Sequence, residues 1–149
     1  MNKPVTQEVA RKSRIDSVLP YLAWTIALVA TAGSLFFSNV MELPPCDLCW
    51  YQRIALFPLV FVIGTGIILR DKRFKFYALP FSITGLAIAI YHNLLYYKFI
   101  PQPIIPCSAG VSCTEVQLEL FGFITIPLMS LAAFVLVTAC LLIYKTKEK

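Results

Sequence analysis

Residues 120–144 of this 149-residue chain read LFGFITIPLMSLAAFVLVTACLLIY, a run of 25 residues without one charged side chain. A helix of about 20 apolar residues crosses the roughly 30 Å hydrocarbon core of a bilayer at about 1.5 Å rise per residue. The run therefore predicts a transmembrane helix, with the bilayer as the solvent of the protein.

Three further apolar blocks of similar length occupy residues 18–40, 50–69 and 76–97. The whole chain is 58% hydrophobic and 14% charged, with a mean hydropathy of +0.74. The first block is longer than the apolar core of a signal peptide and no cleavage site of the Ala-x-Ala kind follows it, so we expect a retained helix. We predict an all-α membrane protein, with residues 1–149 forming one domain that is a four-transmembrane-helix bundle.

The basic residues indicate how the bundle is oriented. All but two of the 13 lysines and arginines precede the first block, separate the second from the third, or follow the fourth. Basic residues near membrane helices stay preferentially on the cytoplasmic side. We therefore expect cytoplasmic N- and C-termini in a multi-pass cell membrane protein, with outer loops at about 41–49 and 98–119. Topology also accounts for the net charge of +5, so no nucleic-acid partner is expected.

Four of the five cysteines lie in these two outer loops. Cys46 and Cys49 belong to the run PPCDLCWYQR at residues 44–53, while Cys107 and Cys113 lie in the second loop. An exterior compartment is where disulfides form and persist. Four cysteines permit three pairings, and the spacing does not choose among them.

The first pair has the features of a reactive dithiol. A Cys-x-x-Cys disulfide closes a very small loop, so it stabilises the fold little and tends to be strained. The apolar run of the second helix starts at about Trp50, which places Cys49 near a helix N-terminus, where the macrodipole lowers a thiol pKa. Arg53 lies four residues on, on the same helical face, and Gln52 adds neutral donors. We expect a stabilised Cys49 thiolate, or else a snorkelling interfacial Arg53 with no redox role.

The second pair lies in a proline-containing loop that cannot span the membrane. Such a loop is exposed enough to meet another protein, whereas the first pair is held at the membrane surface. Two redox-capable pairs at different depths predict a relay from a soluble protein to an acceptor in the membrane. A lipid-soluble quinone suits this role because its tail can lie among apolar helices while its head reaches Cys49 and Arg53.

These features resemble the DsbB family of membrane thiol:quinone oxidoreductases, and most closely its short Gram-positive members of the BdbC type. The resemblance covers nearly the whole chain. It rests on the four spans, the signature from Cys46 to Arg53, the pair Cys107 and Cys113, and the run GFITIP at residues 122–127.

The resemblance implies a monomeric enzyme that reoxidises a DsbA-like (BdbD-type) thiol oxidase and delivers the electrons to menaquinone or ubiquinone. Cys107 would be the sulfur attacked by the reduced partner, giving a mixed disulfide. Cys113 would then pair with Cys46 and free Cys49, whose thiolate would hand its electrons to the quinone. Arg53 would stabilise the negative charge.

One further residue, His92, fits the family pattern, whereas Gln52 and the spacer between the second pair of cysteines depart from it. His92 falls where the family carries a histidine close to the quinone, although a neutral histidine satisfied by a helix-end carbonyl is an equal alternative. Gln52 stands where some members have Glu. The short spacer between Cys107 and Cys113 leaves room for little or no membrane-parallel helix.

Two other functions fit parts of the sequence. Four cysteines could form a tetrahedral, all-thiolate zinc or structural centre, although an oxidising exterior argues against it. A transmembrane carrier of reducing equivalents would need cysteines that are reachable from both faces. Only Cys140 approaches the inner side, and we interpret it as a small packing residue.

Overall fold

The computed structural model describes residues 3–99, 119–120 and 124–145. The described elements are helices α1 (Lys3–Asn39), α2 (Asp47–Ile68), α3 (Phe74–Tyr96) and α4 (Ile126–Ile143), with two-residue strands β1 (Glu119–Leu120) and β2 (Ile124–Thr125). Each of the four helices contains a segment long and apolar enough to cross a membrane. The predicted all-α, four-helix membrane fold is confirmed, and the one addition is the short antiparallel β1–β2 pair.

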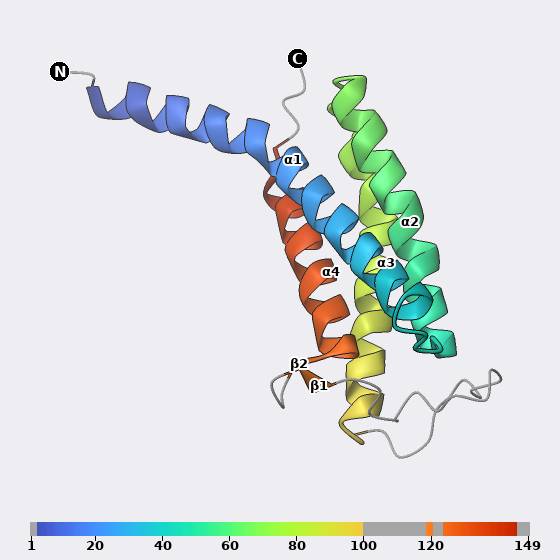
Figure 1. Ribbon diagram of the computed structural model, residues 1–149. Coiled ribbons are helices and arrows are strands. Elements are labelled where there is room, and N and C mark those ends of the chain that lie inside the picture. The colour runs from blue at the N-terminus through green and yellow to red at the C-terminus, as the bar shows by residue number, and fades with distance from the viewer. Residues whose placement is uncertain (1–2, 100–118, 121–123, 146–149) are drawn as a thin grey trace.

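The helices form a closed ring in which α1 packs on α2, α2 on α3, α3 on α4, and α4 on α1. Figure 1 shows that α1 begins and α4 ends towards the end of the bundle where α2 turns into α3, while the two strands lie at the opposite end. The spanning part of α1 is Ser17–Asn39, and the part before it projects away from the bundle (Figure 1).

Two helix starts differ from those expected. Helix α1 begins at Lys3 rather than at about residue 18, because its polar N-terminal part continues the same helix. Helix α4 begins at Ile126 rather than at about residue 120. The Thr125 side chain accepts a bond from the Leu128 amide and caps α4, and the residues just before it pair as strands.

Helix α2 begins at Asp47, three residues before the expected start at Trp50. Cys46 is its N-cap, with extended backbone angles of φ −69° and ψ 166°. An acidic residue in the first turn suits the positive end of the helix macrodipole. The earlier start places Cys49 within the first turn.

The contact between α3 and α4 is the tightest described part of the core. Phe134 of α4 is 2% exposed and lies against Gly85 of α3, where an added Cβ would overlap its ring. The buried hydroxyls of Ser82 and Thr138 share a hydrogen bond of 2.6 Å across the same contact. A glycine and a hydroxyl pair allow the two backbones to approach closely, as is common between membrane helices.

The ends of the helices are closed by local hydrogen bonds. Helices α2 and α3 both end in Schellman motifs, with Arg70 (φ 52°) and Lys98 (φ 59°) in the left-handed conformation. Lys75 donates through Nζ to the carbonyl of Tyr144 at 2.9 Å, at the C-terminal end of α4. This bond ties the first turn of α3 to the C-terminal end of α4.

Candidate active site

The Cys-x-x-Cys pair lies at the start of α2, with Cys46 at the N-cap and Cys49 in the first turn. The Sγ atoms of Cys46 and Cys49 are 3.3 Å apart, and the Cys46 thiol donates a hydrogen bond to the Cys49 sulfur. Cys46 is buried, whereas Cys49 is half-buried. The acceptor sulfur is the one that can hold negative charge, and it lies at the positive end of a helix. The expectation that Cys49 is the thiolate stays a prediction.

The hydrogen bond has a direct effect on the donor. The bond to Cys49 and, next, burial raise the pKa of the Cys46 thiol from 9.0 to about 12, while the contact with His92 acts in the opposite direction. Cys46 therefore keeps its proton at neutral pH. The pair is asymmetric, with Cys46 as the hydrogen-bond donor and Cys49 as the acceptor.

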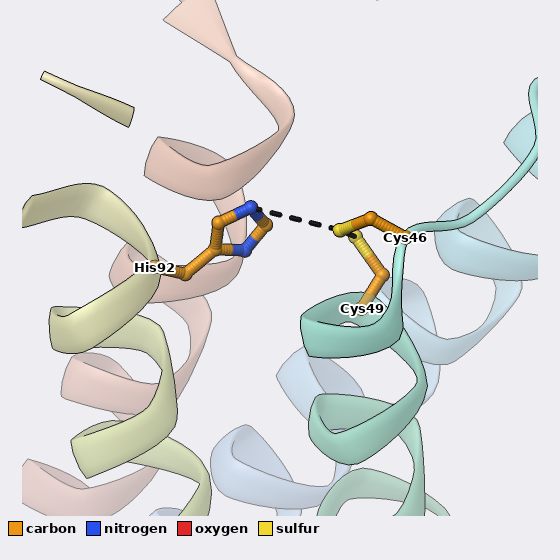
Figure 2. A group of neighbouring side chains, drawn as sticks. All are labelled: Cys46, Cys49 and His92. Carbon is orange, nitrogen blue, oxygen red and sulfur yellow. Dashed lines mark hydrogen bonds between the residues drawn. The ribbon is translucent and has the colours of Figure 1, made fainter. Parts of the chain in front are cut away.

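His92 reaches this pair from α3, as Figure 2 shows. Its ring is 2% exposed, its Nε2 is 3.8 Å from the Cys46 Sγ, and its Nδ1 is 3.3 Å from the Nε2 of buried Gln52. An amide nitrogen is a donor, so with the amide in this orientation the ring proton is on His92 Nε2 and faces the sulfur. Within the part of the chain that the structure describes, the ring thus contacts two residues of the candidate site.

Arg53 is buried, with 7% of its surface exposed, and it points towards α1. Its Nε donates to the Ser34 Oγ at 2.8 Å. Its Nη2 donates to the Ser34 carbonyl at 2.7 Å and to the Ser38 Oγ at 3.0 Å. The side chain also lies over the Trp50 ring, at 5.3 Å from the centroid. A snorkelling side chain would be exposed, whereas this one is buried; whether Arg53 has a redox role stays a prediction.

The two serines that fix Arg53 were missed at the level of sequence. The i to i+4 spacing placed Arg53 beside Cys49, but the structure directs its Nε and Nη2 to α1. Within the described residues Nη1 makes no hydrogen bond, and Arg53 lines the adjoining cavity. A serine pair four residues apart on α1 was the available signal, since it forms one polar stripe on an apolar helix.

An elongated cavity of about 610 Å³ opens beside this cluster. It is lined by all five described candidate residues, which are Cys46, Cys49, Gln52, Arg53 and His92. Its walls continue along α1 from Ser38 to Thr25, a length of about 20 Å at 1.5 Å per residue. Small side chains on both walls leave this space: Ala30 and Gly33 on α1, and Ala132 and Ala133 on α4.

The remaining cysteines fall into two groups. Cys107 and Cys113 lie outside the described residues, and so do their pairing and the four-thiolate alternative. Cys140 is buried in the hydrophobic core of the bundle, as expected for a packing residue. It belongs to the last turns of α4, at the end of the helix away from the cysteine pair.

Comparison with known proteins places this arrangement in a family. The family model described as disulfide bond formation protein DsbB matches residues 16–144. The chain belongs to the DsbB family. No solved structure matches it significantly.

Curated DsbB-family relatives are similar over most of their length. Probable disulfide formation protein C 2 of Bacillus anthracis is 46% identical over 128 residues, which cover 86% of this chain and 91% of that protein. Disulfide bond formation protein C of Bacillus subtilis strain 168 is 43% identical over 139 residues, covering 92% and 98%. A probable disulfide formation protein of Chlamydia trachomatis is 43% identical over 129 residues, covering 87% and 93%. These similarities support an oxidoreductase of disulfide bond formation in a multi-pass membrane protein.

Proposed function

We propose that this DsbB-family protein is a protein-disulfide:quinone oxidoreductase of the cell membrane. It reoxidises a DsbA-like (BdbD-type) thioredoxin-fold thiol oxidase outside the cytoplasm and passes the electrons to a membrane quinone, either menaquinone or ubiquinone. The observation that carries this proposal is the position of the pair Cys46 and Cys49, which line an apolar cavity running along the spanning helices α1 and α4.

The cavity suits the size and chemistry of a quinone. Its volume of about 610 Å³ falls within the roughly 300 to 1,000 Å³ of ligand pockets. The apolar walls on α1 and α4 match an isoprenoid tail. The Nη1 donors of Arg53, the amide of Gln52 and the ring of His92 are the polar groups that would hold carbonyl oxygens. When bound, a quinone supplies an acceptor for two electrons and two protons.

The residues of this chain divide the chemistry among them. Cys49 holds the negative charge of the dithiol, and Cys46 holds its proton. His92 Nε2 lies 3.8 Å from the Cys46 sulfur, and once the Gln52 amide turns to present its oxygen to Nδ1, the Nε2 lone pair can take that proton. Arg53, fixed by α1, places a permanent positive charge on the cavity wall, where low dielectric makes it an effective stabiliser of an anion.

In this proposal the electrons come from the reduced partner and pass through the cysteines of the second outer loop. A reduced partner attacks a Cys107–Cys113 disulfide at Cys107, and the mixed disulfide is resolved when a second partner thiol displaces Cys107. The Cys107–Cys113 dithiol then exchanges with the Cys46–Cys49 disulfide, by way of a Cys113–Cys46 bond that frees Cys49. Each exchange moves two electrons inwards and leaves one disulfide behind. The basic residues at the opposite end of the bundle support an exterior position for this loop.

The test is an anaerobic reaction of the purified protein with a reduced thioredoxin-fold partner and a short-tailed quinone, followed by quinone absorbance. We expect one quinone reduced per partner dithiol oxidised. Cys49→Ser should lower the rate at least about a thousandfold, because no thiolate remains to release electrons. Cys140→Ser is the matched control and should keep the rate. Partner oxidation at an equal rate without quinone would contradict the proposal.

A further inference from the structure

Three metal-binding atoms converge at the start of α2. The Sγ atoms of Cys46 and Cys49 and one ring nitrogen of His92 all lie within 4.8 Å of one another. Within residues 3–99, 119–120 and 124–145, this is the one group of three or more His, Cys, Asp or Glu side chains with ligand-like spacing. Figure 2 shows the His92 ring pointing across from α3 to the two sulfurs.

The spacing of these atoms is close to that of a tetrahedral zinc site. Zn–S bonds of about 2.3 Å and Zn–N bonds of about 2.0 Å put two sulfurs about 3.8 Å apart, and sulfur and nitrogen about 3.5 Å apart. The Cys46 and Cys49 sulfurs are 3.3 Å apart, and the Cys46 sulfur is 3.8 Å from His92 Nε2. For these two pairs the differences are about half an ångström or less, and the third pair, the Cys49 sulfur and a His92 ring nitrogen, lies within 4.8 Å.

We propose that the reduced cysteine pair and His92 form a three-ligand site for a thiophilic cation of the Zn²⁺ class, which blocks oxidation of the dithiol. Two thiolates and an imidazole are the donors that such ions prefer. The fourth position faces the cavity that the three residues line, so a water molecule can complete the shell. This inference goes beyond the proposed function because it concerns the dithiol alone and requires no electron acceptor.

Binding of the ion exchanges a proton and involves no electron transfer. The ion displaces the proton of the Cys46 thiol, and it binds the Cys49 thiolate and the neutral His92 ring, so one proton is released for each ion bound. In the oxidised protein the same sulfurs are in disulfides and offer no thiolate. The site therefore exists only in the reduced state, and an occupied site holds the enzyme there.

Gln52 can orient His92 for either state. A metal-binding histidine usually donates its second ring N–H to an acceptor, which fixes the tautomer. In the structure the Gln52 amide nitrogen faces His92 Nδ1 at 3.3 Å. Turning the amide by half a turn presents its oxygen instead, which moves the ring proton to Nδ1 and frees the Nε2 lone pair for the ion.

The experiment isolates this site from the other thiols. A full-length variant carrying Cys107→Ser, Cys113→Ser and Cys140→Ser is reduced, freed of reductant under anaerobic conditions, and titrated with Co²⁺ and then Zn²⁺. The readout is the thiolate-to-cobalt charge-transfer absorption. We expect one Co²⁺ per chain, displaced by Zn²⁺, and no signal after oxidation of the same variant, which serves as a folded control.

Further substitutions in that variant test each ligand. His92→Ala should weaken the affinity for Co²⁺ at least about tenfold, because one ligand is lost. Gln52→Leu should weaken it by about tenfold, because leucine cannot accept the His92 Nδ1 proton and so cannot fix the ring tautomer that binds the ion. Gln52→Glu should preserve or tighten binding, because a carboxylate is a fixed acceptor. The proposal is overturned if reduced protein binds no Co²⁺, or if binding survives oxidation or is unaffected by His92→Ala. Because no quinone is present, these outcomes are independent of the proposed function.

Discussion

On its α3 side, helix α4 packs so closely that one added Cβ at Gly85 would overlap Phe134, whereas on its α1 side a cavity of about 610 Å³ remains. The α3–α4 contact also carries a buried hydrogen bond between Ser82 and Thr138. The α1–α4 contact is instead lined by small residues, such as Gly33. The same helix is thus packed for stability along one side and kept apart from its neighbour along the other.

In the proposed function, this difference would let a small bundle be rigid and still admit a lipid-borne molecule. The tight side fixes α3, and Asn93 adds a hydrogen bond of 2.8 Å to the Pro127 carbonyl at the start of α4. His92, the neighbour of Asn93, is held in place in this way. The open side lies between spanning helices, where a molecule dissolved in the bilayer can enter beside the cysteine pair.

The two cysteines that line the cavity should differ in reactivity. With a pKa of about 12, Cys46 is about 0.1% thiolate at pH 9, where an ordinary cysteine of pKa 9.0 would be about half thiolate. Because the thiolate is the nucleophile, Cys46 of the reduced protein should react with iodoacetamide at least about a hundredfold more slowly than Cys49, and should speed up as pH rises towards 12. Mass spectrometry of the labelled peptide resolves the two sites. Equal rates at pH 8 would show that the hydrogen bond does not set the order.

A glycine-to-alanine substitution in each helix that flanks α4, Gly85 on α3 and Gly33 on α1, compares the packing of the two contacts directly. Gly85→Ala should lower the free energy of unfolding by about 2 kcal/mol, because the new Cβ displaces Phe134. Gly33→Ala should leave it unchanged or raise it by up to about 1 kcal/mol, because nothing lies within 4 Å of the new Cβ and alanine favours helix. Unfolding in mixed micelles with increasing SDS measures both. Equal effects would mean that the two contacts are packed alike.

Filling the open side should weaken quinone use without unfolding the protein. Gly33→Trp places an indole in the cavity and should raise the KM for a short-tailed quinone by about tenfold, or about 1.4 kcal/mol. Val135→Trp is the control, since Val135 is exposed on α4 outside the cavity lining. Steady-state quinone reduction separates them, and an unchanged KM for Gly33→Trp would place the acceptor elsewhere.

The smallest expected effect is that of removing one hydrogen bond that holds the Arg53 side chain against α1. Ser34→Ala removes the hydroxyl that accepts from Arg53 Nε but leaves the Ser34 carbonyl in place. A lost hydrogen bond of about 1 kcal/mol should raise the quinone KM by about fivefold. Thr65→Ala removes an exposed hydroxyl from α2 outside this cavity and should have no effect. If both variants behave like the unaltered protein, the position of Arg53 does not depend on the Ser34 hydroxyl.

Much of the fold could be predicted because it depends on local patterns. Apolar length predicted four spans, and the start of the second apolar run at about Trp50 placed Cys49 near a helix start. The start of α4 was missed because residues 120–125 are as apolar as the helix that follows. There a threonine cap and a strand pair decide the boundary, and neither changes the hydropathy.

The structure brings the described candidate residues together, but their contacts were not predicted. The candidates Cys46, Cys49, Gln52, Arg53 and His92 all line one cavity. Their partners depend on how the helices are packed against one another, which spacing within one helix does not contain. Helical spacing therefore assigned Arg53 to a sulfur on its own helix, whereas the ring of helices brings α1 alongside and gives it two serines.

The most direct test of the account maps where the electron acceptor lies. A quinone analogue with a photoreactive group on its tail is bound to the full-length protein, cross-linked by light, and located by mass spectrometry of the peptides. The account predicts labelling of residues that face the cavity on α1 and α4, around Gly33 and Ala133, with labelling suppressed by excess unmodified quinone and by Gly33→Trp. Competable labelling confined to the outer faces of α2 and α3 would contradict it.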